Sequence, residues 1–353
     1  MMVRLLLLLC LGACSSPAYY LQAMSGQQKL MKSRQDIQTL LNDPATPTEL
    51  AGHLQTAERI KTFAQTQLDL PVEGSYSTYV EVEGEALVWN VIATPEFSLQ
   101  PKTWCFPVAG CVPYRGYFKQ QKAQDSAEHL SGKGMDVIVS PAAAYSSLGW
   151  FNDPLLSTMF SDSDTRLAAY LFHELAHQRL YIKNDGVFNE GYASFVEDTG
   201  VRAWLEFNQQ QDEIKKWLEL QEVSKNFSSL VGNARSQLAS LYHSNKTDTV
   251  MRQHKADIFR TFEGDYQKLS DEKWQGKRYY SSWFKEPLNN ARFALFNTYE
   301  GSLCAFQGLW DKSGGDWQKF NHLAEKKSRL PKKERQAWLQ QTCPAFGAIY
   351  KKS

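Results

Sequence analysis

The sequence predicts a mainly helical α+β fold, with a small sheet ahead of two central helices and a helical C-terminal half. Three observations lead to this prediction. Short apolar or alternating segments with the two-residue period of strands occur between residues 79 and 139. From about residue 163 to 205, apolar residues recur every three or four positions, which is the period of an amphipathic helix. Long segments with helical periodicity follow from residue 209 onward.

Composition limits the classes of function. The chain has 353 residues, enough for one large domain or two modest ones. Its formal net charge is +1 and it has no block of basic residues, so a nucleic acid is not expected as a partner. The 10 Trp, 16 Tyr and 19 Phe residues indicate a folded chain rather than a disordered one.

Residues 1–13 have the pattern of an export signal. A positive charge at Arg4 precedes the apolar run Leu5–Leu11, which is too short to span a bilayer. The run ends in Leu-Gly-Ala-Cys, which resembles the bacterial lipobox and implies cleavage before Cys14 and lipidation of its sulfur. Ser15 then implies an outer-membrane lipoprotein on the periplasmic side of the bacterial cell envelope. An ordinary secretory signal cut nearby fits the same pattern and also implies export.

Helices are expected first, and strands after them. Gln27–Asn42 and Thr48 to about Leu68 have apolar residues at near-helical spacing, and their simplest role is packing. Residues 79–83 alternate as in a half-buried strand, and Ala86–Ala93 is almost continuously apolar, with Gly84 expected to turn a hairpin between them. The same small sheet is expected to include Tyr114–Phe118 and Met135–Val139.

Four cysteines remain if Cys10 is removed and Cys14 is lipidated: Cys105, Cys111, Cys304 and Cys343. An oxidising compartment favours disulfides, and four cysteines allow three connectivities. Pro107 and Gly110 suit a tight loop between the first two cysteines. We therefore predict disulfides between Cys105 and Cys111 and between Cys304 and Cys343. Buried free thiols are the alternative. No Cys-x-x-Cys spacing occurs, so a zinc ribbon or a redox motif is not expected.

The run His173-Glu174-Leu175-Ala176-His177 carries the clearest chemical signal. A helix turns about 100° per residue, so His173 and His177 share one face and both imidazoles can bind one metal ion. Glu174 then lies beside the ion as a candidate general base. A catalytic zinc needs one more protein ligand and one open position. An ordinary amphipathic helix is the alternative, because the pattern arises by chance in roughly 1 % of chains of this size.

The third ligand is expected from a second helix. The longer HExxHxxGxxH motif is excluded, because Leu180 and Lys183 occupy its Gly and third His positions. Lys183–Val187 is a short connection, after which Glu190 and Glu197 lie seven residues apart and point the same way. We expect Glu190 to ligate and Glu197 to hold a histidine ring and fix its tautomer, although the two roles could be swapped.

N-cap residues and the spacing of apolar residues give the expected bounds of the remaining helices. The motif helix is expected to begin at Asp162 or Ser163, both suitable N-caps, and the second helix to continue to Leu205. Later helices are expected at Gln209–His243 and Val250–Lys268, as an antiparallel pair, and at Leu288–Tyr299, Asp316–Lys327 and Pro331–Gln341.

These motifs resemble those of known metallopeptidases. HExxH followed by Asn-Glu-Gly-(Phe/Tyr)-Ala is typical of the gluzincin metallopeptidases, and Asn189–Ala193 matches that segment. The chain resembles more closely the bacterial family described as predicted aminopeptidases. Its shared segments appear here as Trp104–Cys111, Gly149–Thr158, the HELAH and NEGYASFVE blocks, and Leu288–Arg292. Two features differ from better-known gluzincin aminopeptidases: the gap between the second His and Glu190 is shorter, and no Gly-x-Met-Glu-Asn segment is present to grip a free amine.

The resemblance implies a zincin-like region with one Zn²⁺ and a peptide as substrate. In such enzymes an edge strand pairs with the substrate backbone, and Met135–Ser140 or Ala144–Trp150 is our candidate, with a purely structural sheet as the alternative. Gluzincins commonly stabilise the oxyanion with a Tyr, His or Arg that follows the zinc helices. Arg292 and Tyr299 are our candidates because seven residues apart they share a helix face, while simple packing is the competing explanation.

The predicted organisation is a signal peptide (1–13), a lipid anchor with N-terminal helices (14–75), a zincin-like catalytic region (76–208) and a helical C-terminal region (209–353). The function we expect is zinc-dependent hydrolysis of peptide bonds by an aminopeptidase of short peptides. Zinc would activate a water and Glu174 would be the general base. The alternative is a lipid-anchored envelope protein whose metal site serves partner binding or assembly with little hydrolysis.

Overall fold

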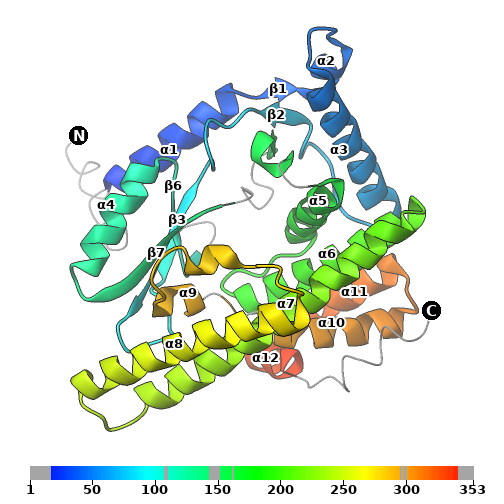
Figure 1. Ribbon diagram of the computed structural model, residues 1–353. Coiled ribbons are helices and arrows are strands. Elements are labelled where there is room, and N and C mark those ends of the chain that lie inside the picture. Colours follow the sequence, from blue (N-terminus) through cyan, green and yellow to red (C-terminus); the bar gives the residue numbers. More distant parts are fainter. Residues whose placement is uncertain are drawn as a thin grey trace, which may run out of the picture.

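The computed structural model describes residues 17–106, 110–142, 152–160, 163–294, 296 and 300–340 (Figure 1). Most of this part of the chain is helical, and its α-helices are α1 (Pro17–Lys32), α2 (Ile37–Asn42), α3 (Thr48–Gln67), α4 (Gln120–Ser131), α5 (Asp164–Arg179), α6 (Gly186–Phe207), α7 (Gln211–Tyr242), α8 (Asp248–Lys273), α9 (Asn290–Ala294), α10 (Glu300–Ser313), α11 (Trp317–Ser328) and α12 (Lys332–Leu339). Two 3-10 helices are η1 (Ser157–Phe160) and η2 (Ser281–Phe284). A mainly helical α+β fold is therefore confirmed.

Short strands form small sheets in the described ranges. The strands are β1 (Gln35–Asp36), β2 (Thr78–Val80), β3 (Trp89–Pro95), β4 (Trp104–Phe106), β5 (Gly110–Val112), β6 (Arg115–Tyr117), β7 (Met135–Pro141) and β8 (Leu155–Leu156). Their orders are β1-β2-β8, β6-β3-β7 and β4-β5. In the second sheet, β3 pairs antiparallel with both neighbours, and Val91 lies opposite Arg115 on one side and Val139 on the other. The strands predicted near residues 86–93, 114–118 and 135–139 thus share one sheet, ahead of α5 in the chain.

The predicted hairpin around Gly84 is wrong. β2 does not pair with β3: it pairs antiparallel with β1 and parallel with β8, so the apolar segments on either side of Gly84 belong to different sheets. A hairpin is a local prediction, whereas both partners of β2 come from distant parts of the chain. Gly84 does adopt a left-handed backbone, with φ +90°, but the turn leads out of one sheet and into another.

Two predicted helices also need correction. The helix expected over Gln27–Asn42 is two helices, α1 and α2, because Asp36 pairs with Thr78 in β1 and its side chain then accepts from Thr39 N as the N-cap of α2. The helix expected over Leu288–Tyr299 is reduced to the five residues of α9, and residues 297–299 lie outside the described ranges. The helices α3, α5 to α8, α11 and α12 match their predicted ranges within a few residues.

The largest hydrophobic core surrounds α5 and α6. Side chains from α3, from both central helices and from the C-terminal helices α10, α11 and α12 meet there, with Phe172, Phe188 and Phe306 fully buried. Gly191 in α6 permits the close approach of α10, because a Cβ atom at this position would lie 2.1 Å from Ser302 Oγ. The C-terminal helices and the two central helices therefore share one core, which holds α5 and α6 firmly side by side.

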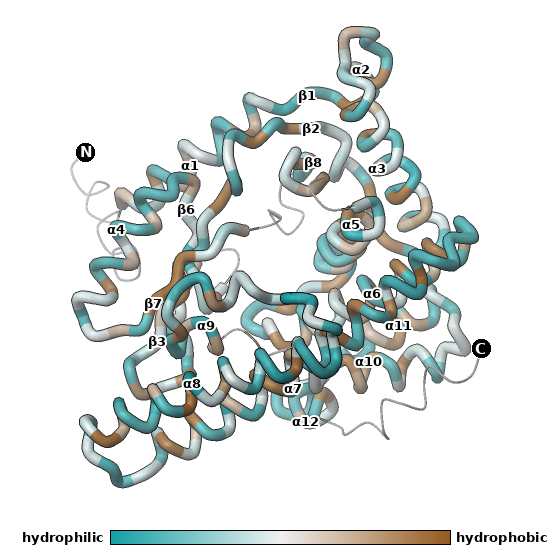
Figure 2. The backbone as a smooth tube through the Cα atoms, viewed as in Figure 1, coloured by the Kyte–Doolittle hydropathy of each residue, from teal (hydrophilic) through white to brown (hydrophobic). Residues whose placement is uncertain are grey.

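A second core lies between the long antiparallel helices α7 and α8, seen along one edge of the molecule in Figure 1. It contains Phe227, Phe262 and Tyr266, and η2 and α9 contribute Trp283 and Phe293. Hydrophobic and hydrophilic residues alternate along both helices in Figure 2, as expected for helices that bury one face. Within the described ranges, every helix is too short or too polar to cross a bilayer.

The disulfide between Cys105 and Cys111 confirms the first predicted pair. The two cysteines are directly opposite each other in the β4-β5 hairpin. Cys304, in α10, is also disulfide-bonded. Cys343, its predicted partner, lies outside the described residues, as does the predicted lipidation site Cys14.

Candidate metal centre

Helix α5 carries the HExxH motif and begins at a sequence-encoded cap. Ser163 accepts a hydrogen bond from Arg166 N through its side chain, 3.2 Å away, in the manner of an N-cap. Leu167, Leu171 and Leu175, four residues apart, are fully buried in the core. This apolar face fixes the rotation of α5, so the motif histidines emerge on another face, toward α6.

Helix α6 supplies the candidate third ligand. Its N-cap Asp185 accepts a hydrogen bond from Phe188 N, and the Asn189 side chain both accepts from Ile182 N at 2.8 Å and donates to Ile182 O at 2.9 Å. The two Asn189 bonds join the first turn of α6 to the connection that follows α5. These bonds therefore fix the position of the next residue, Glu190, relative to the motif histidines.

His173, His177 and Glu190 form one cluster. Each offers a ligand atom, and these atoms all lie within 4.8 Å of one another. His173 Nε2 is 3.4 Å from Glu190 Oε2, and His177 Nε2 is 3.6 Å from Glu190 Oε1. Two ligand atoms of a tetrahedral zinc with Zn–N distances of about 2.0–2.1 Å lie roughly 3.3 Å apart. The two distances to Glu190 are close to this value, and the three residues together could hold a metal ion.

Glu197 lies on the other side of the His173 ring. Its Oε2 atom is 3.0 Å from His173 Nδ1, while Nε2 of the same ring faces Glu190. A proton on Nδ1 donated to this carboxylate leaves the Nε2 lone pair directed at the cluster. Behind Glu197, the neighbouring Asp198 accepts a hydrogen bond from Gln221 Nε2 of α7 at 2.6 Å. Residues of α5, α6 and α7 thus form the surroundings of the His173 ring.

Burial and close contacts shift the pKa values of all three cluster residues. Burial lowers the pKa of His177 to about 4, so its ring is neutral at pH 7, the form that can ligate. Burial raises the pKa of Glu190, but the hydrogen bond with His173 and the nearness of the two imidazoles outweigh it and hold the pKa below its usual value. For His173, burial lowers the pKa, and its bonds with Glu190 and Glu197 raise it well above the usual range. His177 Nδ1 is buried and has no hydrogen-bond partner among the residues that the structure describes.

Glu174 lies beside the cluster without belonging to it. It is half-buried, and its charge raises the pKa values of the Tyr76 and Tyr114 hydroxyls after the larger effect of burial. Such a carboxylate, adjacent to a metal site and only partly covered, can exchange protons with a bound water or substrate.

Three tyrosines near the cluster were not predicted from the sequence. The pKa values of Tyr114 and Tyr181 are raised first by burial of the hydroxyl and then by the charge of Glu190, although the Tyr114 residue as a whole is 40 % exposed. The Tyr181 ring centroid is 6.4 Å from that of His177. Tyr76 is 1 % exposed, and its backbone is left-handed with φ 56°. Within the described part of the chain, its hydroxyl has no hydrogen-bond partner. Tyr181 follows His177 by four residues and lies just beyond the end of α5, so its nearness in the sequence could have suggested it. Tyr76 and Tyr114 are distant in sequence and gave no signal.

Of the two candidate oxyanion residues, the structure describes Arg292. Arg292 lies in α9, its guanidinium is 3.7 Å from the Glu286 carboxylate, and within the described residues no hydrogen bond or ion pair joins it to His173, His177 or Glu190. Tyr299 lies outside the described residues. Of the two candidate substrate strands, β7 is an edge strand of its sheet, and Ala144–Trp150 lies outside the described ranges.

Comparison with known proteins agrees with the motifs. A search of curated proteins and a search of solved structures each give no match. A family model described as putative aminopeptidase matches residues 18–339, which is most of the chain and includes both central helices. The chain therefore belongs to the putative aminopeptidase family.

Proposed function

We propose that this protein is a zinc-dependent peptidase and that His173, His177 and Glu190 hold the metal ion. Family membership suggests peptidase activity and implies a peptide substrate. The observation that carries the proposal is the convergence of both histidine Nε2 atoms on the two oxygens of Glu190, at 3.4 and 3.6 Å. Two imidazoles and one carboxylate are a donor set used by catalytic zinc sites, in which a fourth position stays open.

The chemistry follows from the residues around that open position. When bound, zinc supplies a Lewis acid that polarises a peptide carbonyl and makes a water acidic near neutral pH. Glu174 is proposed to accept the water proton and return it to the leaving amine. Glu197 holds the His173 ring so that Nε2 keeps facing the cluster. The Tyr114 hydroxyl, close enough to feel the charges of Glu190 and Glu174, is a candidate to contact the substrate.

Cleavage from the N-terminus of short peptides is the form of the activity that we propose, in keeping with the description of the family. We also propose an envelope location, with the chain anchored by a lipid on Cys14. This location follows from the export signal and the lipobox-like Leu-Gly-Ala-Cys sequence.

Replacing Glu174 by Gln tests the mechanism. The E174Q variant is expected to bind zinc as the wild type does and to lose turnover by a factor of about 10² to 10⁴, the usual contribution of a general base. Aminoacyl nitroanilides and internally quenched peptides provide the assay, with a chelator-treated sample as the blank. E206Q is a matched control, because Glu206 lies at the far end of α6 and pairs with Arg202.

Two outcomes would contradict the proposal in different ways. Full hydrolysis by purified E174Q would show that another group is the base. A wild-type protein that binds zinc but hydrolyses no substrate of the panel would favour the alternative role, in which the metal site serves binding or assembly.

A further inference from the structure

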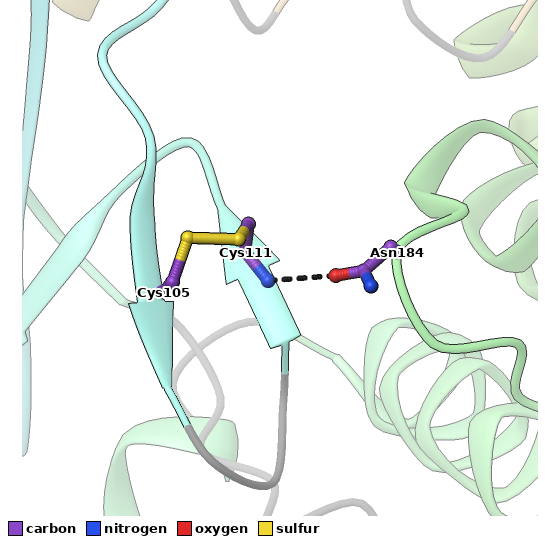
Figure 3. The surroundings of a disulfide bond; sticks show 3 residues. All are labelled: Cys105, Cys111 and Asn184. Atoms are coloured by element: carbon purple, nitrogen blue, oxygen red, sulfur yellow. Dashed lines mark hydrogen bonds between the residues drawn. A yellow bond between two sulfur atoms is a disulfide. The ribbon is translucent and has the colours of Figure 1, made fainter.

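The connection between α5 and α6, residues 180–185, determines how the two histidines face Glu190. Asn184 lies in this connection with a left-handed backbone, φ 62°. Its side-chain Oδ1 accepts a hydrogen bond from the backbone N–H of Cys111, 2.8 Å away, which Figure 3 shows. Cys111 belongs to the disulfide hairpin β4-β5, 73 residues earlier in the chain. The hairpin therefore touches the segment that joins the two halves of the metal cluster.

The contact between hairpin and connection is too close for a side chain to intervene. A Cβ atom at Gly110 would lie 2.3 Å from Asn184 Oδ1 and 3.1 Å from Lys183 Cγ. Gly110 also has φ +77°, a conformation that side chains other than glycine rarely adopt. Glycine at this position thus lets the hairpin backbone pack directly against Asn184.

Further bonds transmit the position of Asn184 to Glu190. The Asn184 carbonyl accepts from Lys332 Nζ at 3.4 Å, and the following residue, Asp185, caps α6. Asn189 binds both the N–H and the carbonyl of Ile182, so the connection and the first turn of α6 form one hydrogen-bonded unit. Glu190 follows Asn189 directly. A displacement of Asn184 would move the start of α6, and Glu190 with it.

We propose that Asn184 is a positioning residue for the metal centre, and that the Cys105–Cys111 hairpin is the rigid part against which it fixes Glu190. This inference rests on the proposed function, because it assumes that the cluster binds zinc. The disulfide closes the hairpin at the very residue whose N–H binds Asn184. The hairpin conformation, and with it the donor, is thereby fixed before zinc arrives.

The test is zinc affinity, measured by competition with a chromogenic chelator on the full folded protein. In N184G the side-chain acceptor is lost and the left-handed backbone remains easy to adopt. Zinc binding is expected to weaken about tenfold, the lower end of the effect of removing a group that supports a metal ligand. N184D keeps the acceptor and tolerates this backbone, so it should restore affinity to within about twofold of the wild type.

A second variant tests the hairpin itself. C105S/C111S removes the disulfide and keeps a backbone N–H at position 111, but the disulfide no longer fixes where that N–H lies. Zinc binding is therefore expected to weaken to a similar degree as in N184G. A reductant is unsuitable for this purpose because Cys304 is also disulfide-bonded. N208G is the matched control: Asn208 Nδ2 donates to Trp204 O at the other end of α6, so this variant loses one comparable bond away from the ligands.

The outcomes separate the inference from the function on which it rests. Unchanged zinc affinity in both N184G and C105S/C111S would overturn the role of Asn184 while leaving the metal centre intact. Equal weakening in N208G would also overturn it, because general loosening of α6 would then be the cause. A wild-type protein without zinc affinity would overturn both the inference and the proposed function.

Discussion

Glu190 and Glu197 are two turns apart on α6, yet they meet different atoms. Glu190 faces the Nε2 atoms of both motif histidines, whereas Glu197 binds Nδ1 of His173. The arrangement favours Glu190 as the ligand and Glu197 as the group that orients a ring, rather than the reverse. It also explains why the acidic residues are seven positions apart: a spacing of two turns puts one carboxylate on each side of the same imidazole.

Asp198 gives a pH-dependent prediction at the residue scale. Burial raises the pKa of Asp198 well above its usual value, and the charge of Glu197 raises it further. In the unfolded chain an aspartate releases its proton near pH 3.9. As pH rises above that value the unfolded state loses the proton while the folded state retains it, so the free energy of unfolding falls until the folded pKa is passed.

The D198N variant should remove this loss, because asparagine resembles the protonated acid and keeps the acceptor for Gln221. In chelator-treated protein, D198N is expected to unfold at the same temperature as wild type near pH 4 and at a higher one at pH 8. For a chain of 353 residues, each kcal/mol regained should raise the midpoint by about 1–2 °C. Thermal unfolding followed by circular dichroism measures this, and a lower midpoint for D198N at pH 8 would contradict it.

Some of the candidate site could be predicted because its information is local. His173 and His177 are one turn apart, and Glu190 follows after a short connection, so helix geometry alone relates them. Tyr114 and Asn184 could not be found in this way. Their relation to the site depends on the β4-β5 hairpin packing against the α5-α6 connection, and no spacing in the sequence encodes that contact.

Helices and strands were likewise predicted best where their signals are local in the sequence. Helices with caps and an apolar face, such as α5 with Ser163, were predicted closely because their signals lie within the element. Helix α4 was not predicted, since only Ala123 and Leu130 of its twelve residues are buried and the apolar period is weak. Strand partners depend on the whole chain, which is why the β2 pairing was wrong while the segments near β3, β6 and β7 were right.

Helix α12 provides a prediction at the element scale. Arg335 donates to the Asp185 carboxylate, Nε to Oδ2 at 2.6 Å, with side-chain exposures of 7 % and 3 %. The R335M variant leaves Asp185 buried without its partner and should lower the free energy of unfolding by about 3–5 kcal/mol. The pair variant R335M/D185N removes that charge and keeps an N-cap side chain, so it should recover a large part of the loss.

Urea unfolding of the wild type and both variants measures these differences. A loss below about 0.5 kcal/mol for R335M, the range of ordinary surface substitutions, would contradict a structural role for this ion pair.

The described part of the chain has three hydrophobic cores: the first two meet around α6 and α7, and the third lies between α4 and the β6-β3-β7 sheet. The first core holds the central helices, and the second belongs to α7, α8 and α9. Lys255 of α8 joins the second unit to the β6-β3-β7 sheet, donating to Glu96 O at 2.8 Å and to Asp136 at 2.6 Å. The edge strand β7 is thus held by α8 in addition to its pairing with β3.

The proposed lipid anchor gives a prediction for the whole protein. In a bacterial host, the C14S variant should fail to incorporate labelled palmitate and should move from the membrane fraction to the soluble fraction. S15D should remain lipidated and shift from the outer to the inner membrane, because the residue after the cysteine directs sorting in the lipobox interpretation. Palmitate incorporation by C14S would contradict the assignment.

The start of α1 at Pro17 has a consequence for access to the enzyme. Two residues separate it from Cys14, so an acyl-modified Cys14 would keep the first helical turn within about 11 Å of the headgroups. Leu21 and Met24, 67 % and 69 % exposed, would then be close to that boundary. If the proposed lipid anchor is present, the protein would sample only a thin layer next to the membrane, which small peptides would enter more easily than bulky folded proteins.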